Sequence, residues 1–276
     1  MKISIISPVY FAEKILSQLV KEVKKTFTEL PYDYELVLVD DGSGDQSWEV
    51  IEDLVKEHSF VRGIKLSRNF GQHYALTAGI KSATGDVNII IDCDLQDPPS
   101  NIPFLIDAYK EGNEIVFTQR DKRKHGLLKS FYSKVFNWSF KYFSDQNFDV
   151  NMGTMILFSV KAKEAFLKLE DYDRLYLQLF KWIGLKNTTI VVKHSERISG
   201  KSTYTIGKLF ALALQGFTSF SNKLLKISIA IGLIFSLLSF LSILVIAVMK
   251  YLYGFQTGWA SIISTIFLAV GAFNLS

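Results

Sequence analysis

The chain is poor in cysteine and, over its last part, in charge. It has one cysteine, Cys93, among 276 residues, which excludes an internal disulfide framework and favours a reducing compartment. After Lys226 the only charged residue is Lys250. We therefore expect a polar globular part followed by a membrane part.

The pattern of a secretory signal is missing as well. The apolar stretch Ile3–Val9 is short and contains serine and proline, unlike the apolar core of a signal peptide. Lysines flank the longest apolar run unequally, because three lie within residues 208–226 and only Lys250 follows the run. By the positive-inside bias, residues 1–226 are expected in the cytoplasm.

Two apolar runs end the chain. Residues 227–249 carry no charge and, at about 1.5 Å per residue, can cross a hydrocarbon layer of roughly 30 Å, so they predict a transmembrane helix. Residues 259–273 are fewer, which predicts either a span cut short by the chain end or a re-entrant segment. Residues 203–226 mix apolar residues with lysine and predict an amphipathic interfacial helix on anionic lipid, ahead of a membrane domain over 227–276.

Up to residue 120, β-type runs alternate with segments of helical period. This alternation is typical of an α/β fold with a mostly parallel, doubly wound sheet and helices on both faces. The expected strands are 2–7, 34–40, 61–66, 86–92 and 114–119, and the expected helices are 12–28, 46–58, 71–82 and 100–110. Residues 126–200 indicate two more helices and a mixed strand region, and the globular domain is expected to cover 1–202.

Polar clusters follow the first four expected strands. They are "SPVY" (7–10), "DDGSGD" (40–45), "SRNFGQH" (67–73) and "DCDLQDPP" (92–99). In open α/β sheets ligands bind beyond the carboxyl ends of the strands. We therefore expect these four loops to form one site.

The fourth loop is crowded with carboxylates. On an extended strand Asp92 and Asp94 would share one face, with Cys93 turned toward the core. Two carboxylates so close repel each other unless a cation lies between them, and with the oxygens of Gln96 and Asp97 nearby they favour Mg²⁺ or Mn²⁺. The alternative is a solvated acidic turn before a helix that begins with two prolines.

The second loop lacks the G-x-G-x-x-G spacing of a dinucleotide-binding loop. Its leading acids, Asp40 and Asp41, suit acceptance of hydrogen bonds from a nucleobase N–H or from ribose hydroxyls. The alternative is an Asp-Gly turn in which Asp45 caps the next helix. We expect both, on different residues.

Basic residues in three places indicate anion binding. Arg68 and His73 lie at a strand-to-helix junction, where backbone N–H groups attract anions, although a lone histidine is more often a surface or capping residue. Arg120 directly follows the fifth expected strand. The segment "RISGKSTY" (197–204) is able to hold a diphosphate or lipid phosphate, or else is a polar linker before a helix.

These motifs, in this order and followed by apolar runs, resemble glycosyltransferase family 2, in particular its polyprenyl-phosphate glycosyltransferase branch. Dolichyl-phosphate mannose synthases and bacterial undecaprenyl-phosphate sugar transferases belong to that branch. The similarity extends over nearly the whole chain, and the D-x-D-L-Q-D-P-P form is specific. The resemblance implies a GT-A fold, a nucleotide-sugar donor and a divalent metal, Mg²⁺ or Mn²⁺.

The resemblance also implies roles for individual residues. Catalysis would involve Asp94, Arg120 and Lys201, and the metal would be ligated by Asp92, Asp94 and Gln96. The nucleotide-sugar would be bound by Pro8, Tyr10, Glu13, Asp40, Asp41, Arg68 and Asp92. The donor diphosphate or acceptor phosphate would be contacted by Arg197, Lys201, Ser202 and Tyr204, and the acceptor would lie near Trp182.

Three departures from the family pattern stand out. Where relatives commonly have P-V-Y-N-E-E, this chain has "PVYFAE", so Phe11 and Ala12 replace polar residues and the base preference is open. Where relatives have Gly-Asp-Tyr or Gly-Asp-Phe, with the aspartate as presumed base, Thr154 follows Gly153, and the nearest acid upstream is Asp149. The basic tail that usually follows the second membrane helix is also missing.

The expected activity is that of a membrane-bound inverting transferase that moves a sugar from a nucleotide-sugar to polyprenyl (undecaprenyl) phosphate, for cell-envelope glycan or lipid modification. A phosphate monoester has a second pKa of about 6 and needs no base at neutral pH, whereas a hydroxyl acceptor does, so Thr154 favours the phosphate. The alternatives are transfer to a hydroxyl of a lipid-linked or surface glycan, and an inactive paralogue that binds nucleotide-sugar.

The expected location is the inner (plasma) membrane, as a multi-pass protein with a cytoplasmic catalytic domain. The expected partners are the nucleotide-sugar, polyprenyl phosphate and anionic lipid. Nucleic acid is not expected, and a homo-oligomer is left open.

Overall fold

The computed structural model describes residues 1–120, 152–169, 175–192 and 222–254, and the single positions 258, 262, 265, 266 and 269. The chain divides into two units, Met1–His125 with Asp149–Thr203, and Gly126–Phe148 with Tyr204–Ser276. The first contains a seven-stranded sheet and the second a long apolar helix.

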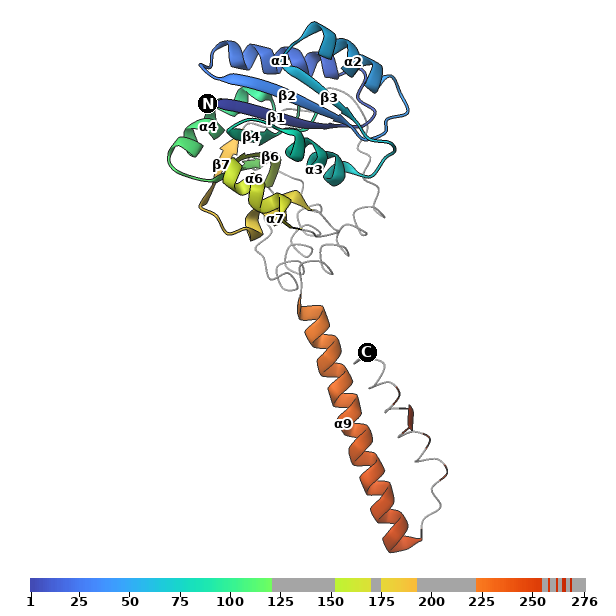
Figure 1. The fold of residues 1–276 in the computed structure, drawn as a ribbon. Coiled ribbons are helices and arrows are strands. Elements are labelled where there is room, and N and C mark those ends of the chain that lie inside the picture. The colour runs from blue at the N-terminus through green and yellow to red at the C-terminus, as the bar shows by residue number, and fades with distance from the viewer. Residues whose placement is uncertain are drawn as a thin grey trace, which may run out of the picture. The chain divides into compact units, whose positions relative to one another are not determined.

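The sheet has the strand order β3-β2-β1-β4-β6-β5-β7 (Figure 1). Its strands are β1 (Lys2–Val9), β2 (Asp33–Asp40), β3 (Val61–Lys65), β4 (Val87–Ile90), β5 (Ile115–Arg120), β6 (Met152–Ser159) and β7 (Asn187–Val192). β1 is parallel to β2 and β4, β2 to β3, and β5 to β7, whereas β6 is antiparallel to both β4 and β5. The sheet is therefore mixed, with mostly parallel pairs as predicted and one antiparallel strand between β4 and β5.

Helices cover both faces of the sheet (Figure 1). On one face, α1 (Leu16–Thr28), α2 (Ser47–Glu57) and α4 (Ile102–Lys110) contribute side chains to the main core cluster. On the other face, α3 (Gln72–Ser82) packs on β1 and β2, and α6 (Val160–Leu167) packs on β4 and β6 and contacts α7 (Tyr176–Trp182). A short 3₁₀ turn, η1 (Pro99–Asn101), leads into α4.

The apolar periodicity of the sequence explains these layers. In α1 the buried residues recur every three or four positions, which makes one apolar stripe on an otherwise polar helix. In β1 every residue from Ile3 to Val9 is buried, as expected of a strand covered by helices on both faces. Every strand and helix expected up to residue 120 is present. The largest differences in length are that β1 extends to Val9 rather than to residue 7, α1 begins at Leu16 rather than at residue 12, and β4 ends at Ile90 rather than at residue 92.

The antiparallel course of β6 matters for the site. In its register with β4, Ile156 lies opposite Ile90. The first residues of β6, Met152–Thr154, therefore lie at the carboxyl end of β4. The loops that follow β1 to β4 and the start of β6 share one edge of the sheet.

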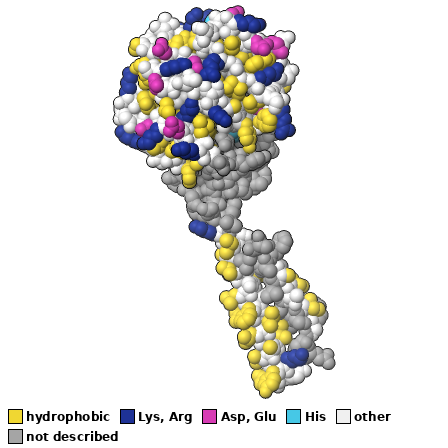
Figure 2. All heavy atoms as spheres, in the orientation of Figure 1, with side chains coloured by type: hydrophobic (Ala, Val, Ile, Leu, Met, Phe, Trp, Pro, Cys, Tyr) yellow, Lys and Arg dark blue, Asp and Glu magenta, His cyan; other side chains and the backbone are white. Residues whose placement is uncertain are grey.

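The second unit contains α9 (Asn222–Tyr253). Among the residues that the structure describes, its segment Lys226–Tyr253 is the one helix long and apolar enough to cross a membrane, with a mean hydropathy of 2.8. The helix begins at Asn222, so residues 222–226, which were expected to end an interfacial helix, are part of α9 instead. Hydrophobic side chains cover the visible face of α9, whereas charges of both signs are interspersed over the visible face of the first unit (Figure 2).

The remaining membrane predictions fall largely outside the described residues. Residues 203–221 of the expected interfacial helix belong to that part of the chain. Of the expected second span, 259–273, only positions 262, 265, 266 and 269 are described, and each is helical. A second complete span stays a prediction.

Candidate functional site

Backbone hydrogen bonds align the loops at the carboxyl edge of the sheet. The N–H of Asp41 donates to the carbonyl oxygen of Val9 at 2.9 Å, and the N–H of Leu66 donates to that of Asp40 at 2.9 Å. On the other side of β1, the N–H of Ile91 donates to the carbonyl oxygen of Ile6 at 3.0 Å. The four polar loops therefore lie along one edge, as the sequence predicted.

The two acids of the second loop have different surroundings. Both oxygens of Asp41 accept backbone hydrogen bonds, from Phe70 at 2.8 Å and Gly71 at 2.9 Å. Burial raises the pKa of Asp41, which these two hydrogen bonds oppose and the charge of Asp40 reinforces. Asp41 thus joins the second loop to the third.

Asp40 is fully buried, and its Oδ1 accepts the N–H of Ser43 at 3.2 Å. Its Oδ2 has no hydrogen-bond partner among the residues that the structure describes. Of the two acids, Asp40 is therefore the one with an oxygen to offer to a ligand. As expected, Asp45 accepts the N–H of Ser47 in the first turn of α2, at 3.1 Å.

Gly42 allows the second and third loops to touch. Its φ is +67°, in the left-handed region, and a Cβ placed on it would lie 2.4 Å from the carbonyl carbon of Arg68. Only glycine fits such a close approach of two backbones. The Arg68 side chain itself is exposed, and its guanidinium lies 4.8 Å from the centre of the Phe70 ring.

The expected alternation of Asp92 and Asp94 along a strand is wrong. β4 ends at Ile90, and Asp94 lies in a turn in which Leu95 has a φ of 57°. The backbone reverses there, which removes the two-residue periodicity that the prediction assumed. Oδ1 of Asp94 accepts the N–H of Gln96 at 3.1 Å, which closes this turn.

Cys93 is turned toward the core, as predicted, and packs against its main cluster. Burial, reinforced by the charges of Asp92 and Asp94, raises the pKa of the Cys93 thiol to about 12. Oδ1 of Asp92 accepts a hydrogen bond from Nε2 of Gln72 at 2.9 Å. Gln72, in the first turn of α3, thus orients one of the two acids.

The oxygen donors of this loop fit a hard divalent cation whose coordination is completed by substrate oxygens. Among residues 1–120, 152–169, 175–192 and the described part of the C-terminal region, no group of three or more His, Cys, Asp or Glu side chains is placed to hold a metal. Asp92, Asp94 and Gln96 offer two carboxylates and an amide. Mg²⁺ is commonly held by one or two carboxylates together with substrate phosphates.

Asp97 and Thr154 form a contact that the sequence did not indicate. Asp97 is 1% exposed, and its Oδ2 accepts a hydrogen bond from Oγ1 of Thr154 at 2.8 Å. The hydroxyl of Tyr176 on α7 donates to the carbonyl oxygen of Thr154 at 2.8 Å, and the ring of His73 lies 5.8 Å from that of Tyr176. The site therefore includes α7, and His73 faces it.

Two predicted residues have other surroundings than expected. Trp182 is 63% exposed at the last position of α7, about 9 Å along the helix from Tyr176, so Tyr176 is the α7 aromatic that reaches the Thr154 cluster. Oε2 of Glu13 accepts a hydrogen bond from the N–H of Gln46 at 3.1 Å. This carboxylate therefore binds the backbone at the start of α2. Nothing in the sequence singled out Tyr176, whereas Asp97 belongs to the acidic motif itself.

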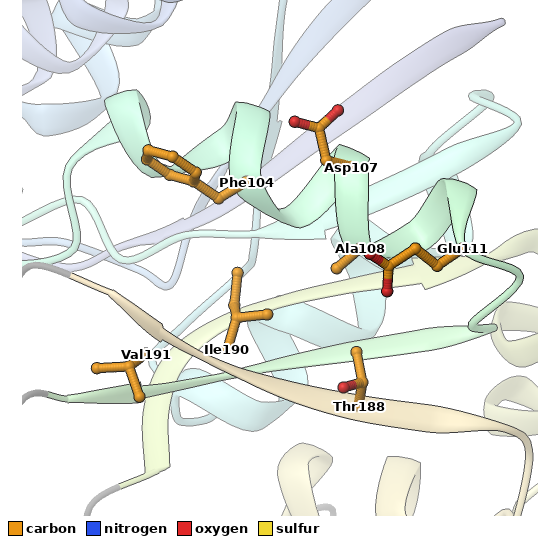
Figure 3. A pocket seen from close by; sticks show the side chains of 7 residues that line it. All are labelled: Phe104, Asp107, Ala108, Glu111, Thr188, Ile190 and Val191. Carbon is orange, nitrogen blue, oxygen red and sulfur yellow. The ribbon is translucent and has the colours of Figure 1, made fainter.

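Most of the predicted phosphate-binding side chains fall outside the described residues. Arg120 ends β5, but its side chain is not described, nor are Arg197, Lys201, Ser202 and Tyr204. Away from the site edge, a groove of about 300 Å³ lies between α4 and β7, where Ile190 points toward the helix (Figure 3). It includes none of the predicted site residues.

Known proteins resemble this chain over most of its length. A family model described as glycosyl transferase family 2 matches residues 4–163. The bactoprenol glucosyl transferase of Shigella phage SfV is 35% identical over 246 residues, which are 87% of this chain and 79% of that protein. The undecaprenyl-phosphate 4-deoxy-4-formamido-L-arabinose transferase of Proteus mirabilis is 30% identical over 276 residues, covering 98% and 84%. A crystal structure of glucosyl-3-phosphoglycerate synthase from Mycobacterium tuberculosis with Mn²⁺ and UDP-glucose shares the fold, with a TM-score of 0.55 and 18% identity over 78% of this chain and 76% of its own.

Proposed function

Because the chain belongs to glycosyl transferase family 2, we propose that it is a membrane-bound inverting enzyme that moves a sugar from a nucleotide-sugar to polyprenyl phosphate, with undecaprenyl phosphate as the acceptor to test first. The product would be a polyprenyl-phosphate sugar, released together with a nucleoside diphosphate. Such a product would serve cell-envelope glycan or lipid modification.

Similarity over nearly the full chain carries this proposal. The Proteus mirabilis relative acts on undecaprenyl phosphate by its name, and the match covers 98% of this chain. A match of that extent includes α9 as well as the sheet. An apolar acceptor and an apolar helix able to span a membrane belong together, because the acceptor's phosphate must be presented at the membrane surface.

The surroundings of Thr154 support a phosphate acceptor over a hydroxyl acceptor. At the position where the family commonly has an aspartate, this chain has an uncharged hydroxyl that already donates to buried Asp97. A hydroxyl acceptor needs a base to remove its proton. A phosphate monoester, with a second pKa of about 6, is largely ionised at neutral pH and attacks without one.

We assign the donor to the carboxyl edge of the sheet. Asp40, with Pro8 and Tyr10 beside it, would face the base and ribose, and the diphosphate would lie toward the fourth loop. Asp92, Asp94 and Gln96 would hold Mg²⁺ or Mn²⁺, which when bound supplies Lewis-acid stabilisation of the departing diphosphate. Further fixed charge for donor and acceptor phosphates would come from Arg68, Arg120, Arg197 and Lys201, with hydroxyls from Ser202 and Tyr204.

The membrane placement follows from the same proposal. With α9 as a span, a second span over 259–273 would make the protein multi-pass. The lysine distribution around the first span favours a cytoplasmic sheet domain, where nucleotide-sugars are available. Trp182 and an interfacial helix over 203–221 would then lie toward the lipid acceptor.

The experiment uses the full chain in detergent with undecaprenyl phosphate, Mg²⁺ or Mn²⁺, and a panel of radiolabelled UDP-, GDP- and TDP-sugars. Metal-dependent label in the organic extract from one donor, released by mild acid as expected of a sugar phosphodiester, would establish the reaction and name the sugar. Asp94→Asn should abolish labelling, whereas Asp53→Asn, at an exposed position on α2, should not. Acid-stable label on a hydroxyl acceptor, or nucleotide-sugar binding without any transfer, would contradict the proposal.

A further inference from the structure

Two aromatic side chains follow β1 and stay exposed. Tyr10 is 48% exposed and Phe11 57%. Their ring centres are 4.6 Å apart and the ring planes meet at 85°, so the two rings form one edge-to-face pair. Neither ring is needed to fill the core, because the buried cluster nearby is completed by Ala12 and Val9.

The pair lies between the two acidic loops of the site. The backbone of Tyr10 hydrogen-bonds to the thiol of Cys93, which stands between the acids of the fourth loop. The N–H of Phe11 donates to Oγ of Ser43 in the second loop at 3.1 Å. The Phe11 ring covers Gly44, since a Cβ on that glycine would lie 3.3 Å from its Cζ.

Phe11 is held in a backbone conformation that suits it poorly. Its φ is 51°, in the left-handed region, where bulky L-residues are rare and asparagine is several-fold enriched. Hydrogen bonds on both sides keep it there. Besides the Ser43 contact, the N–H of Ala12 donates to Oγ of Ser47 at 2.9 Å, and Glu13 accepts the N–H of Gln46 at 3.1 Å. The second loop and the start of α2 thus fix the backbone around Phe11, and the strained residue stays 57% exposed.

Phe11 is held in a strained backbone conformation although its ring is not buried in the core. Strain of this kind is concentrated at ligand-binding and active sites. We propose that Phe11, paired with Tyr10, forms a stacking platform for the nucleobase of the donor. At this position the chain would therefore contact the flat face of the base. The inference rests on the proposed function, because a nucleotide donor is its premise. Since every nucleobase has a π face, such a platform binds different bases with similar strength.

The test compares binding and stability in the same variants of the full chain. Affinities for UDP and GDP, each with Mn²⁺, are measured by calorimetry in detergent, with inorganic pyrophosphate as the probe that has no base. Melting temperatures are measured without ligand. Phe11→Asn should weaken UDP and GDP binding by about tenfold and leave pyrophosphate binding within a factor of about two. Phe11→Asn should also raise the melting temperature, because asparagine tolerates positive φ better than phenylalanine.

Two further variants keep the result interpretable. Phe11→Trp retains an aromatic face and should keep the wild-type affinity for both nucleotides. Phe104→Asn removes a phenylalanine of similar exposure, 63%, on α4 beside the groove of Figure 3, and should leave all three affinities unchanged.

The inference fails if Phe11→Asn binds UDP as wild type does, loses pyrophosphate binding to the same extent, or melts at a lower temperature, since each result makes Phe11 a packing residue. If the wild-type chain binds no nucleoside diphosphate, the proposed function fails together with the inference. Wild-type binding that is insensitive to Phe11 overturns the inference alone.

Discussion

The hydroxyl of Thr154, at the start of β6, donates a hydrogen bond of 2.8 Å to Oδ2 of Asp97, in the loop after β4. The two residues are far apart in sequence and meet because β6 runs antiparallel to β4. Asp97 is buried, whereas Thr154 is partly exposed. The contact couples the acidic motif to the strand where the family commonly has its presumed base.

Because of this contact, we expect substitution of Thr154 to change the free energy of unfolding but not the pH dependence of sugar transfer. Thr154→Val should lower the free energy of unfolding by about 1–3 kcal/mol, because a buried carboxylate loses a hydrogen-bond donor. Thr154→Ser keeps a hydroxyl and should retain most of that stability. Denaturation of both variants in detergent measures the difference. Since an ionised phosphate needs no base, the pH–rate profile of transfer should keep its shape in both variants. Loss of the acidic limb, where the rate rises with pH, in Thr154→Val would contradict the phosphate acceptor.

Gln72 should control metal affinity without touching the metal. Its side-chain amide orients Asp92 through a 2.9 Å hydrogen bond, and loss of such outer partners typically weakens metal binding by about 10–100-fold. Gln72→Leu should therefore raise the Mn²⁺ concentration needed for half-maximal transfer. Gln18→Leu, which removes an exposed glutamine of α1 that bonds to Glu22, is the control. An unchanged Mn²⁺ midpoint in Gln72→Leu would contradict this positioning role of Gln72.

Gly42 should tolerate no side chain. Alanine there combines positive φ with a Cβ only 2.4 Å from the Arg68 backbone, so Gly42→Ala should lower the melting temperature strongly and disturb nucleotide binding. Gly71→Ala is a matched control, because Gly71 also has positive φ, +101°, but a Cβ on it would meet nothing within 4 Å. The backbone of Gly71, with φ 101° and ψ 152°, lies in a region that is essentially limited to glycine, so a larger loss in Gly42→Ala would reveal the steric conflict. Equal losses would mean that backbone strain alone accounts for the effect.

Glu35 should make the sheet domain sensitive to acid. It lies in β2 near the amino end of the sheet, with its side chain 5% exposed between Lys2 and Arg62. Although burial alone would raise the pKa of Glu35, hydrogen bonds from Ser4, Thr84 and Arg62 lower it from 4.5 to about 2.

Because the pKa of Glu35 is lower in the folded chain than in the unfolded chain, its ionised form stabilises the fold above about pH 4.5, and this contribution is lost as the pH falls toward 2. Glu35→Gln should therefore be less stable than the wild type at pH 7, by about 1–3 kcal/mol. The gap should narrow between pH 4.5 and 2. Denaturation curves at several pH values measure the gap, and a gap independent of pH would contradict the depressed pKa.

The acidic loop shows where local pattern stops being informative. The isoleucines of "IIID" predict a strand and the acids after it predict a site, and both are present. The pattern could not show that the chain leaves the strand at Ile90 and reverses through a left-handed Leu95. Alternation describes side chains only while the backbone stays extended, and a single positive φ ends it. The motif therefore located the acids but not their mutual orientation.

Tyr176 and Trp182 show the same limit over a longer range. Both lie on α7. The family resemblance implied Trp182 near the acceptor, which stays a prediction, and the sequence did not indicate that Tyr176 contacts Thr154. Which face and end of a helix reach a site depends on how the helix packs on the sheet. In that packing the ring of Phe180 on α7 stacks on Phe166 of α6 and lies tilted against Phe158 of β6. These contacts join three separate elements, and no local signal specifies them.

By itself the sequence determined the alternation of strands and helices up to residue 120, the gathering of polar loops at one edge of the sheet, and an apolar helix near the end of the chain. These properties follow from periodicity and composition, which act over a few residues. Only the tertiary structure decided that Thr154 meets Asp97, that Gln72 orients Asp92, and that Phe11 is strained between two loops. Each of these depends on how strands distant in sequence pair and align, because hydrogen bonds and close contacts require atoms to be within a few ångströms, and sequence spacing does not encode that distance.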